Sequence, residues 1–159
     1  MKLTILTVGK LKDAPWRELE GHYLKLLSRY GPCEVLEVRD AKLGAKRLSG
    51  AEREKAVAAE AENLLARVPE TARLIALDER GREMSSQEMA AWLEERTHEG
   101  RDLIFALGGP LGHAPAVRER ADDTLALGRI TLPHQMARVV LLEQLYRCWT
   151  IIRGETYHY

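Results

Sequence analysis

Residues 102–112 read DLIFALGGPLG, an apolar run that ends directly in a glycine-rich turn. The apolar half is short and made mostly of large side chains, which is typical of a strand buried on both faces of a parallel sheet. The glycines that follow allow positive φ and let the backbone approach a ligand closely. Ligands of open α/β sheets bind beyond the carboxyl ends of the strands. Residues 108–112 are therefore a candidate ligand loop, although an ordinary tight turn would use the same residues.

Strands and helices are expected to alternate on both sides of this run. Apolar or alternating stretches predict further strands over residues 2–8, 33–38, 73–78 and 129–132. Helical periodicity predicts helices over residues 15–30, 49–68, 85–98, 115–122 and 135–149, two of which begin with a Ser-x-x-Glu capping box. Residues 79–81 are expected to form a turn, and residues 40–48 a polar loop. The alternation predicts one α/β domain over residues 1–159, with a mainly parallel sheet and helices on both faces.

Composition indicates a soluble cytoplasmic protein. Hydrophobic residues make up 45% of the 159 positions and charged residues 30%, as in ordinary globular proteins. No apolar run approaches the roughly 20 residues that a membrane-spanning helix needs, and the N-terminus lacks the features of a signal peptide. Cys33 and Cys148 stand far apart, and the histidines show no metal-ligand spacing. Free thiols and no metal are therefore expected.

The net charge is zero, but the two ends of the chain are more basic than the middle. Residues 1–29 hold six Lys/Arg against three Asp/Glu, and residues 129–159 hold four against two. If the ends meet in space, they would form a local positive face of the kind that phosphate binding needs. Chance segregation of surface charge explains the same numbers, so charge alone leaves both readings open.

The last predicted helix is apolar around most of its circumference. Its polar positions are few, namely Arg138, Glu143, Gln144 and Arg147. Such a helix must be covered on most sides. We expect a second subunit to supply part of the cover in a two-fold homodimer. The alternative is a central core helix in a monomer.

The C-terminal residues Tyr157 and His158 are unusual for a free terminus, which is normally polar and frayed. Two functions fit them: stacking on a flipped base and proton transfer near neutral pH. A tail docked on the core for stability is the plain alternative. Arg147 has the spacing for an ion pair with Glu143 and could instead turn to a phosphate. Asp78 is interpreted as a turn residue rather than a ribose ligand.

Three segments together closely resemble one known family. They are MKLTILTVGKLKD at residues 1–13, LIFALGGPLGH at residues 103–113, and ITLPHQMARVVLLEQLYRCWTIIRGETYHY at residues 130–159. The resemblance is to the ribosomal large subunit methyltransferase H family, which belongs to the knotted SPOUT methyltransferases. It covers essentially the whole chain, and the last segment is its most specific part.

The resemblance implies an α/β sheet whose C-terminal part is threaded through a loop as a trefoil knot. It implies a homodimer that binds S-adenosyl-L-methionine in the knot. It also implies methylation of N3 of a pseudouridine in helix 69 of 23S rRNA, within the assembled 70S ribosome. No metal and no membrane take part. Topological rules would have argued against a knot, because true knots are very rare.

Site residues follow from the same resemblance, position by position. The cofactor pocket is expected to be lined by Leu77, Gly108, Gly109, Leu127, Gly128, Arg129, Ile130, Thr131 and Leu132. Catalysis and RNA binding are expected of Arg147, Tyr157 and His158. Two departures stand out, since Gly128 replaces a common serine and Tyr159 replaces a common charged residue. The first suits a backbone contact, whereas the second removes one expected phosphate contact.

These residues suggest a mechanism in which the protein mainly positions the reactants. His158 is the candidate base for the N3 proton, Tyr157 the candidate to orient the base, and Arg147 the candidate to hold a phosphate or a developing anion. Two other classes remain open: a methyltransferase of the same fold that acts on tRNA, and a ribosome-binding protein without chemistry. A nucleotide hydrolase is disfavoured, because the phosphate-binding lysine and the metal carboxylates are missing.

Overall fold

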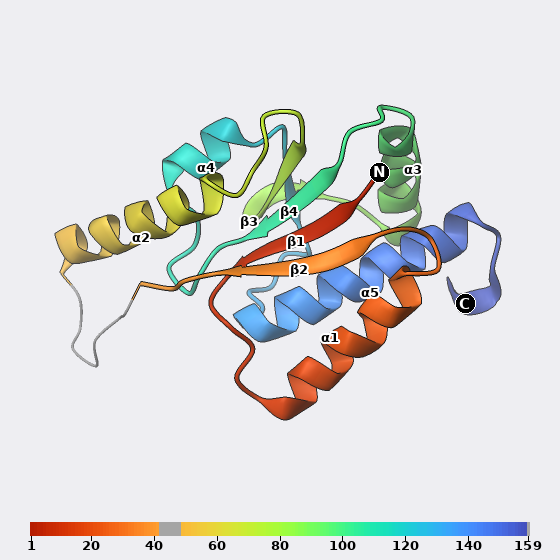
Figure 1. Cartoon of the computed structure of the whole chain (residues 1–159), viewed down its shortest axis with the longest axis horizontal. Helices are drawn as coiled ribbons and strands as arrows, with labels where there is room; N and C mark the ends of the chain where they lie inside the picture. Colours follow the sequence, from red (N-terminus) through yellow and green to blue (C-terminus); the bar gives the residue numbers. More distant parts are fainter. Residues whose placement is uncertain (42–48, 159) are drawn as a thin grey trace.

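In the computed structural model, which describes residues 1–41 and 49–158, a five-stranded parallel sheet forms the centre of the molecule (Figure 1). The strands lie in the order β2-β1-β4-β3-β5, and all four neighbouring pairs are parallel. Their bounds are β1 Leu3–Val8, β2 Cys33–Val38, β3 Arg73–Glu83, β4 Leu103–Leu107 and β5 Asp123–Ala126. The glycine-rich turn therefore follows a central strand, at the edge where the carboxyl ends of the strands meet.

Helices cover both faces of the sheet (Figure 1). One face packs against α1 Ala14–Leu27, α3 Ser86–Thr97 and α5 His134–Ile152. The other face packs against α2 Gly50–Leu65 and the short α4 Pro115–Arg120. Both expected capping boxes are present, at Ser49 with Glu52 and at Ser85 with Glu88. The predicted fold class, an α/β sheet with helices on both faces, is confirmed.

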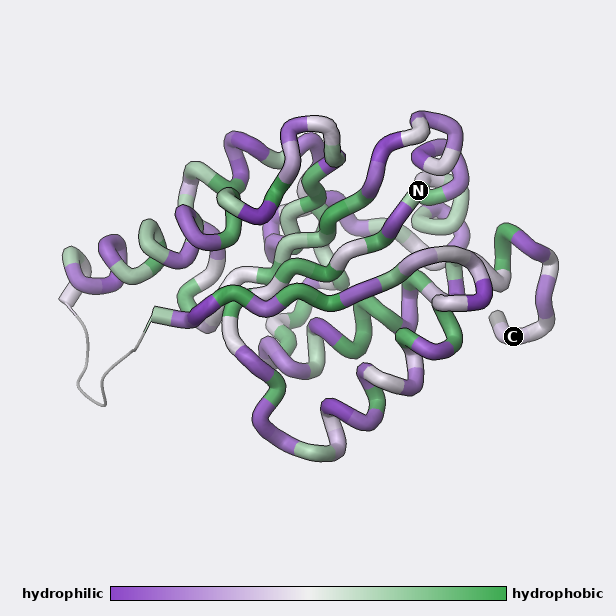
Figure 2. Tube along the Cα trace, viewed as in Figure 1, coloured by the Kyte–Doolittle hydropathy of each residue, from purple (hydrophilic) through white to green (hydrophobic). Residues whose placement is uncertain are grey.

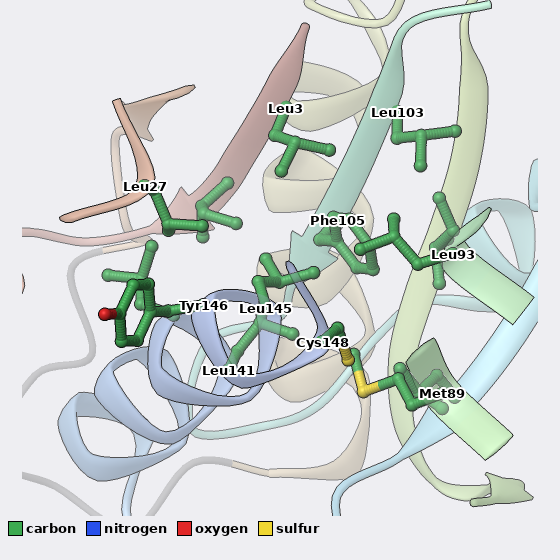
Figure 3. Packing of buried hydrophobic residues seen from close by; sticks show 14 of the residues in the cluster. Leu3, Leu27, Met89, Leu93, Leu103, Phe105, Leu141, Leu145, Tyr146 and Cys148 are labelled. Carbon is green, nitrogen blue, oxygen red and sulfur yellow. The ribbon is translucent and has the colours of Figure 1, made fainter. Parts of the chain in front are cut away.

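The central strands form the most apolar part of the trace (Figure 2). Their side chains alternate between two buried clusters, so the sheet is buried on both faces. On the α1/α3/α5 side, Phe105 and Leu103 of β4 meet Leu93 of α3 and Leu145 of α5 (Figure 3). This burial from both sides explains why β1 and β4 read as nearly continuous apolar runs.

Two local predictions are wrong. No strand forms over residues 129–132; the fifth strand lies earlier, at β5, and the chain from residue 127 to the start of α5 is irregular. The expected turn at residues 79–81 is also absent, because β3 continues to Glu83. The register between β3 and β5 shifts between Leu77 and Arg82, and a Cβ on Gly81 would lie 2.5 Å from the Leu125 carbonyl carbon. A glycine here thus allows two backbones to approach, rather than ending a strand. The loop predicted over residues 40–48 falls almost entirely outside the described residues.

Most of the surface of helix α5 is buried by other parts of the same chain. Leu141, Leu142 and Leu145 are completely buried in the single chain, between α1, α3 and the sheet. The apolar circumference that suggested a second subunit is therefore explained by a central core helix. Arg138, near the start of α5, is 1% exposed and pairs with Glu20 of α1 and Glu37 of β2. The homodimer and the trefoil knot stay predictions.

Candidate functional site

A cavity of about 430 Å³, here called the strand-end cavity, opens at the carboxyl ends of β3 and β4. Its walls come from three segments: the middle of β3, the glycine-rich turn after β4, and the chain that leads into α5. The lining residues are Leu77, Asp78, Glu79, Arg80, Leu107, Gly108, Gly109, Pro110, Leu111, Gly112, His113, Arg118, Thr131, Leu132, His134 and Ala137. A concave site of this volume beyond parallel strands is the expected place for a small ligand.

A smaller cavity of about 160 Å³, the side cavity, adjoins it. The two share a wall formed by six residues: Leu77, Asp78, Glu79, Thr131, Leu132 and Ala137. Leu125, Leu127, Gly128 and Ile130 complete the side cavity, which makes its lining more apolar than that of its neighbour. Together the two cavities form one elongated, concave site.

Most residues predicted to line the cofactor pocket lie around these cavities. Leu77, Thr131 and Leu132 border both, Gly108 and Gly109 border the strand-end cavity, and Leu127, Gly128 and Ile130 border the side cavity. Arg129 borders neither. Its side chain is 88% exposed and reaches Glu83 across 3.8 Å.

The glycine-rich turn folds back on itself beneath the strand-end cavity. The Gly112 N–H donates to the Gly109 carbonyl at 2.9 Å, and Gly112 has a φ of +78°. A Cβ on Gly108 would lie 2.9 Å from the Gly112 carbonyl carbon. A side chain there would push backbone against backbone, so the turn depends on glycine for its shape.

Two charged side chains at the cavity rim, Asp78 and Arg118, are paired with each other. Asp78 accepts from the Arg118 Nε at 2.7 Å and from the Arg80 N–H at 3.0 Å. Burial works to raise the pKa of Asp78, but these hydrogen bonds and the Arg118 charge lower it on balance. The carboxylate thus stays ionised and ties β3 to α4. The predicted turn at Asp78 is wrong, because β3 continues through this residue.

Two histidines that sequence reasoning did not place in the site line the strand-end cavity. His113 is 6% exposed, and its Nε2 lies 3.1 Å from the Ala106 carbonyl oxygen. His134 opens α5, and its Nε2 lies 2.9 Å from the Thr7 Oγ1 of β1. Burial lowers the pKa of both, so the neutral imidazole is favoured. Their positions in the sequence could have indicated this role, because His113 directly follows the glycine-rich turn and His134 directly precedes the last predicted helix.

The predicted catalytic residues lie elsewhere, in a group here called the tail cluster: Glu143, Arg147, Tyr146 and Tyr157. The Glu143 Oε1 accepts from the Arg147 Nε at 3.0 Å and from the Tyr157 hydroxyl at 3.3 Å. The Arg147 guanidinium lies 5.0 Å from the Tyr157 ring centre, over its face. The Tyr146 and Tyr157 rings meet edge to face at 4.6 Å. The expected ion pair of Arg147 is therefore present.

Arg147 and Tyr157 of the tail cluster stay protonated near neutral pH. Burial raises the pKa of Tyr157, and the hydrogen bond that Arg147 donates to Glu143 raises the pKa of Arg147. Both side chains can therefore donate hydrogen bonds at any ordinary pH. His158 ends the short η1 helix, Thr156–His158, so its backbone lies beside this cluster.

The two groups of predicted residues lie at opposite ends of α5. His134 begins the helix at the strand-end cavity, and Arg147 follows thirteen positions later. At 1.5 Å per residue, that places Arg147 about 20 Å further along the helix axis. Figure 1 shows the C-terminus at this far end of α5. Within one chain the tail cluster and the cavities therefore do not form a single site.

Residues 1–158 match the family model described as "Predicted SPOUT methyltransferase". The chain belongs to the SPOUT methyltransferase family. Its sequence is 45% identical over 159 residues to the Ribosomal RNA large subunit methyltransferase H of Carboxydothermus hydrogenoformans, with 99% of each chain covered. It is 46% identical over 160 residues to the protein of the same name from Geobacter sulfurreducens, with 100% of each covered.

Solved structures share the fold of this SPOUT chain at low sequence identity. A probable methylase family protein from Haemophilus influenzae superposes with a TM-score of 0.53 at 13% identity, over 98% of this chain and 69% of the other. A putative methyltransferase from Legionella pneumophila, solved with bound SAM, gives 0.51 at 11% identity, over 91% and 65%. S-adenosyl-L-methionine is the cofactor of the SPOUT family, as the sequence resemblance implied.

The two cavities fit that cofactor. Their volumes suit an adenosine with an attached amino acid, and the apolar side cavity matches a flat purine. Within the described residues, no main-chain hydrogen bond ties the N–H groups of residues 128–132 to another part of the backbone. Those groups remain free to pair with the polar edge of an adenine. The glycine turn offers close backbone approach on the opposite wall.

The part of the chain that the structure describes contains neither a cluster of metal ligands nor a helix that could span a membrane. Across residues 1–41 and 49–158, no three His, Cys, Asp or Glu side chains come together as metal ligands. Over the same residues, every helix is too short or too polar to span a bilayer.

Proposed function

We propose that this SPOUT methyltransferase transfers a methyl group from S-adenosyl-L-methionine to N3 of a pseudouridine in helix 69 of 23S rRNA, within the assembled 70S ribosome. The observation that carries the proposal is the elongated site at the strand ends, lined by Leu77, Gly108 and residues 127–132 without Arg129. Relatives at 42–46% identity over nearly their full length are named for methylation of large-subunit rRNA. The protein is expected in the cytoplasm, with its C-terminal part in a trefoil knot.

The side cavity would hold the adenine and the strand-end cavity the methionine part. Bound there, the cofactor supplies an activated methyl group on a sulfonium, which carries its own leaving group. Backbone groups of residues 128–132 would pair with the adenine edge, and the glycine turn would shape the opposite wall. The chain's own task is then to orient the target base and to accept its N3 proton.

The tail cluster supplies residues suited to that second task. His158 is proposed as the acceptor of the N3 proton, because an imidazole can take a proton near neutral pH. Tyr157 would stack on or orient the base. Arg147 would bind a nucleotide phosphate in place of its present partner Glu143, because a guanidinium pairs with phosphate oxygens as well as with a carboxylate.

The separation along α5 leads us to propose a composite site in a homodimer. In one chain, Arg147 of the tail cluster lies ten positions, or about 15 Å along the helix axis, beyond Ala137, the last α5 residue that lines the strand-end cavity. A two-fold partner would bring the tail of one subunit to the cavity of the other, and would form two equal sites. The basic ends of the chain, residues 1–29 and 129–159, would gather on the same assembly and favour RNA.

The substrate is tested by methyl transfer from radiolabelled S-adenosyl-L-methionine to material from a strain that lacks this gene. Whole ribosomes, separate large subunits and bulk tRNA are compared. We expect label in 23S rRNA of whole ribosomes, mapped to the helix 69 pseudouridine. Label in tRNA alone would overturn the substrate and keep the cofactor, and the absence of label would favour a ribosome-binding protein without chemistry.

The composite site is tested by co-expressing two impaired variants in one cell and assaying methyl transfer at a cofactor concentration well below the wild-type Kd, where weaker cofactor binding limits activity. Gly108→Ala damages the cavity and Arg147→Ala damages the tail cluster. If the tail acts in the partner's cavity, mixed dimers carry one intact site, and activity returns to about one quarter of wild type, because half of the dimers are mixed and half of their sites are intact. If the tail acts on its own cavity, no mixed dimer is active and nothing returns.

A further inference from the structure

One ionisable group in the core has no part in the mechanism above. Glu60 of α2 is 4% exposed, although glutamate is almost never fully buried unless it is paired. Its Oε1 accepts from the Ala41 N–H at 2.9 Å. Its Oε2 is buried and has no hydrogen-bond partner among the described residues. A buried polar atom left in this state costs stability, so its retention calls for a reason.

The unpaired oxygen lies against the glycine-rich turn. A Cβ on Gly109 would stand 2.9 Å from the Glu60 Oε2 and 3.3 Å from the Val8 Cγ1. The carboxyl group therefore packs directly on the Gly109 backbone, and a side chain at residue 109 would displace it. Gly109 is also the residue whose carbonyl closes the turn by accepting from the Gly112 N–H.

The turn is a thin wall between Glu60 and the strand-end cavity. A void of about 10 Å³ behind the turn is lined by Glu60, Gly108, Gly112 and His113. The last three of these residues also line the strand-end cavity on the other side. The void is too small for an organic ligand. Glu60 can therefore act on the cavity only through the turn.

We propose that Glu60 is a positioning residue of the cofactor site, which supports the 108–112 turn from behind and ties it to the chain at Ala41. The proposal rests on the function proposed above. Burial raises the pKa of Glu60 and the neighbouring Asp40 adds to this, whereas the hydrogen bond from the Ala41 N–H lowers it. The geometry points to a role through shape and hydrogen bonding, because Oε1 accepts from the Ala41 N–H and Oε2 contacts the turn with no partner among the described residues. A neutral side chain of the same shape should therefore replace Glu60.

The test compares S-adenosyl-L-methionine affinity, by calorimetry, with hydrogen exchange at the Gly112 amide in the cofactor-free protein. For Glu60→Ala we expect about tenfold weaker binding and faster Gly112 exchange. We also expect a higher KM for the cofactor with an unchanged kcat at saturation. Glu60→Gln should restore all of these to within about threefold of wild type. The matched control, Glu62→Ala, alters an exposed glutamate of the same helix and should change none of them.

Glu60→Leu keeps the buried volume if the alanine variant fails to fold, and it should show the same loss of affinity and faster exchange. Normal affinity and exchange in a folded Glu60→Ala or Glu60→Leu variant would overturn the proposal. A Glu60→Gln variant as weak as Glu60→Ala would also overturn it, since the charge would then be what matters. If the wild-type protein itself binds no S-adenosyl-L-methionine, the proposed function fails instead, and exchange at Gly112 still reports on Glu60.

Discussion

The strand-end cavity and the tail cluster are built in different ways. The cavity takes its shape from backbone at three places: a glycine turn, a bulged strand, and the irregular residues 128–132, whose N–H groups make no main-chain hydrogen bond among the described residues. The tail cluster is formed by side chains, in which one carboxylate holds an arginine and a tyrosine. A backbone site recognises a fixed ligand by shape, whereas a side-chain site can exchange its internal partners for a phosphate or a base. The difference indicates a division of labour between holding the cofactor and handling the RNA.

The sharpest way to break this division is to remove Arg147. We expect Arg147→Ala to lower methyl transfer by about 100-fold or more, as for other positioned charge-stabilising groups. S-adenosyl-L-methionine affinity should stay within about twofold of wild type, because Arg147 lies about 15 Å along α5 from Ala137, the last helix residue that lines the cavity. Methylation kinetics and calorimetry measure the two effects separately. The control is Arg67→Ala, which removes an exposed arginine beyond the C-terminal end of α2.

An equal loss of activity and cofactor affinity in Arg147→Ala would end the division of labour, since the two regions would then act as one. Normal activity would remove Arg147 from the mechanism. Normal activity in a Tyr157→Phe, His158→Ala double variant would likewise remove the tail.

A second experiment tests whether the backbone of the glycine-rich turn shapes the cavity. Gly108→Ala places a Cβ 2.9 Å from the Gly112 carbonyl carbon and 3.0 Å from its oxygen, so the turn must shift. We expect S-adenosyl-L-methionine affinity to fall about tenfold, because a backbone clash cannot be relieved by a side-chain rotation. Gly21→Ala is the control, since its Cβ meets nothing within 4 Å and α1 should gain about 0.5–1 kcal/mol. An unchanged affinity in Gly108→Ala would mean that the turn does not shape the site.

The same contrast explains which parts were predictable from sequence. Strands β1 and β4 read correctly because burial on both faces leaves a continuous apolar run. The capping boxes of α2 and α3 also read correctly, since they are local chemistry. Gly81 was misread as a turn signal, because a close approach between β3 and β5 depends on a strand far away in sequence. The same long-range pairing decided that β5 lies before, and not at, residues 129–132.

The site residues also include some that could be predicted from the sequence and some that could not. The glycine turn and Leu77 could be placed at the strand ends because parallel sheets bind ligands there. The distance between these residues and Arg147 could not be predicted, because it depends on the direction in which α5 runs from the cavity as one unbroken helix. The sequence did not indicate a role for Glu60, because this residue looks like an ordinary charged position on a helix. Its burial behind Gly109 follows only from the fold.

The smallest expected effect is a difference between the two regions in how their stability depends on pH. His113 lies in the cavity wall, and burial, its largest cause, lowers its pKa in the folded state. The unfolded chain, with an ordinary pKa of about 6.5, therefore takes up a proton first as the pH falls. Stability from the neutral His113 is fully present above about pH 6.5 and is lost below it, by at most about 1.4 kcal/mol per pH unit. Arg147 and Tyr157 of the tail cluster have no such transition, because their raised pKa values keep them protonated.

His113→Gln keeps an amide that can donate to the Ala106 carbonyl, as Nε2 does at 3.1 Å, but cannot titrate. Melting temperatures of both proteins between pH 7.5 and 5 measure the difference, with the variant expected to have the flatter profile. His134 has a lowered pKa for the same reason, so part of the slope should survive in the variant and disappear only when both histidines are replaced. Amide exchange near pH 5.5 should then rise first in the turn at residues 108–112 and not at the end of α5. Faster exchange at the end of α5 instead would show that the cavity is the more robust region and would reverse the comparison.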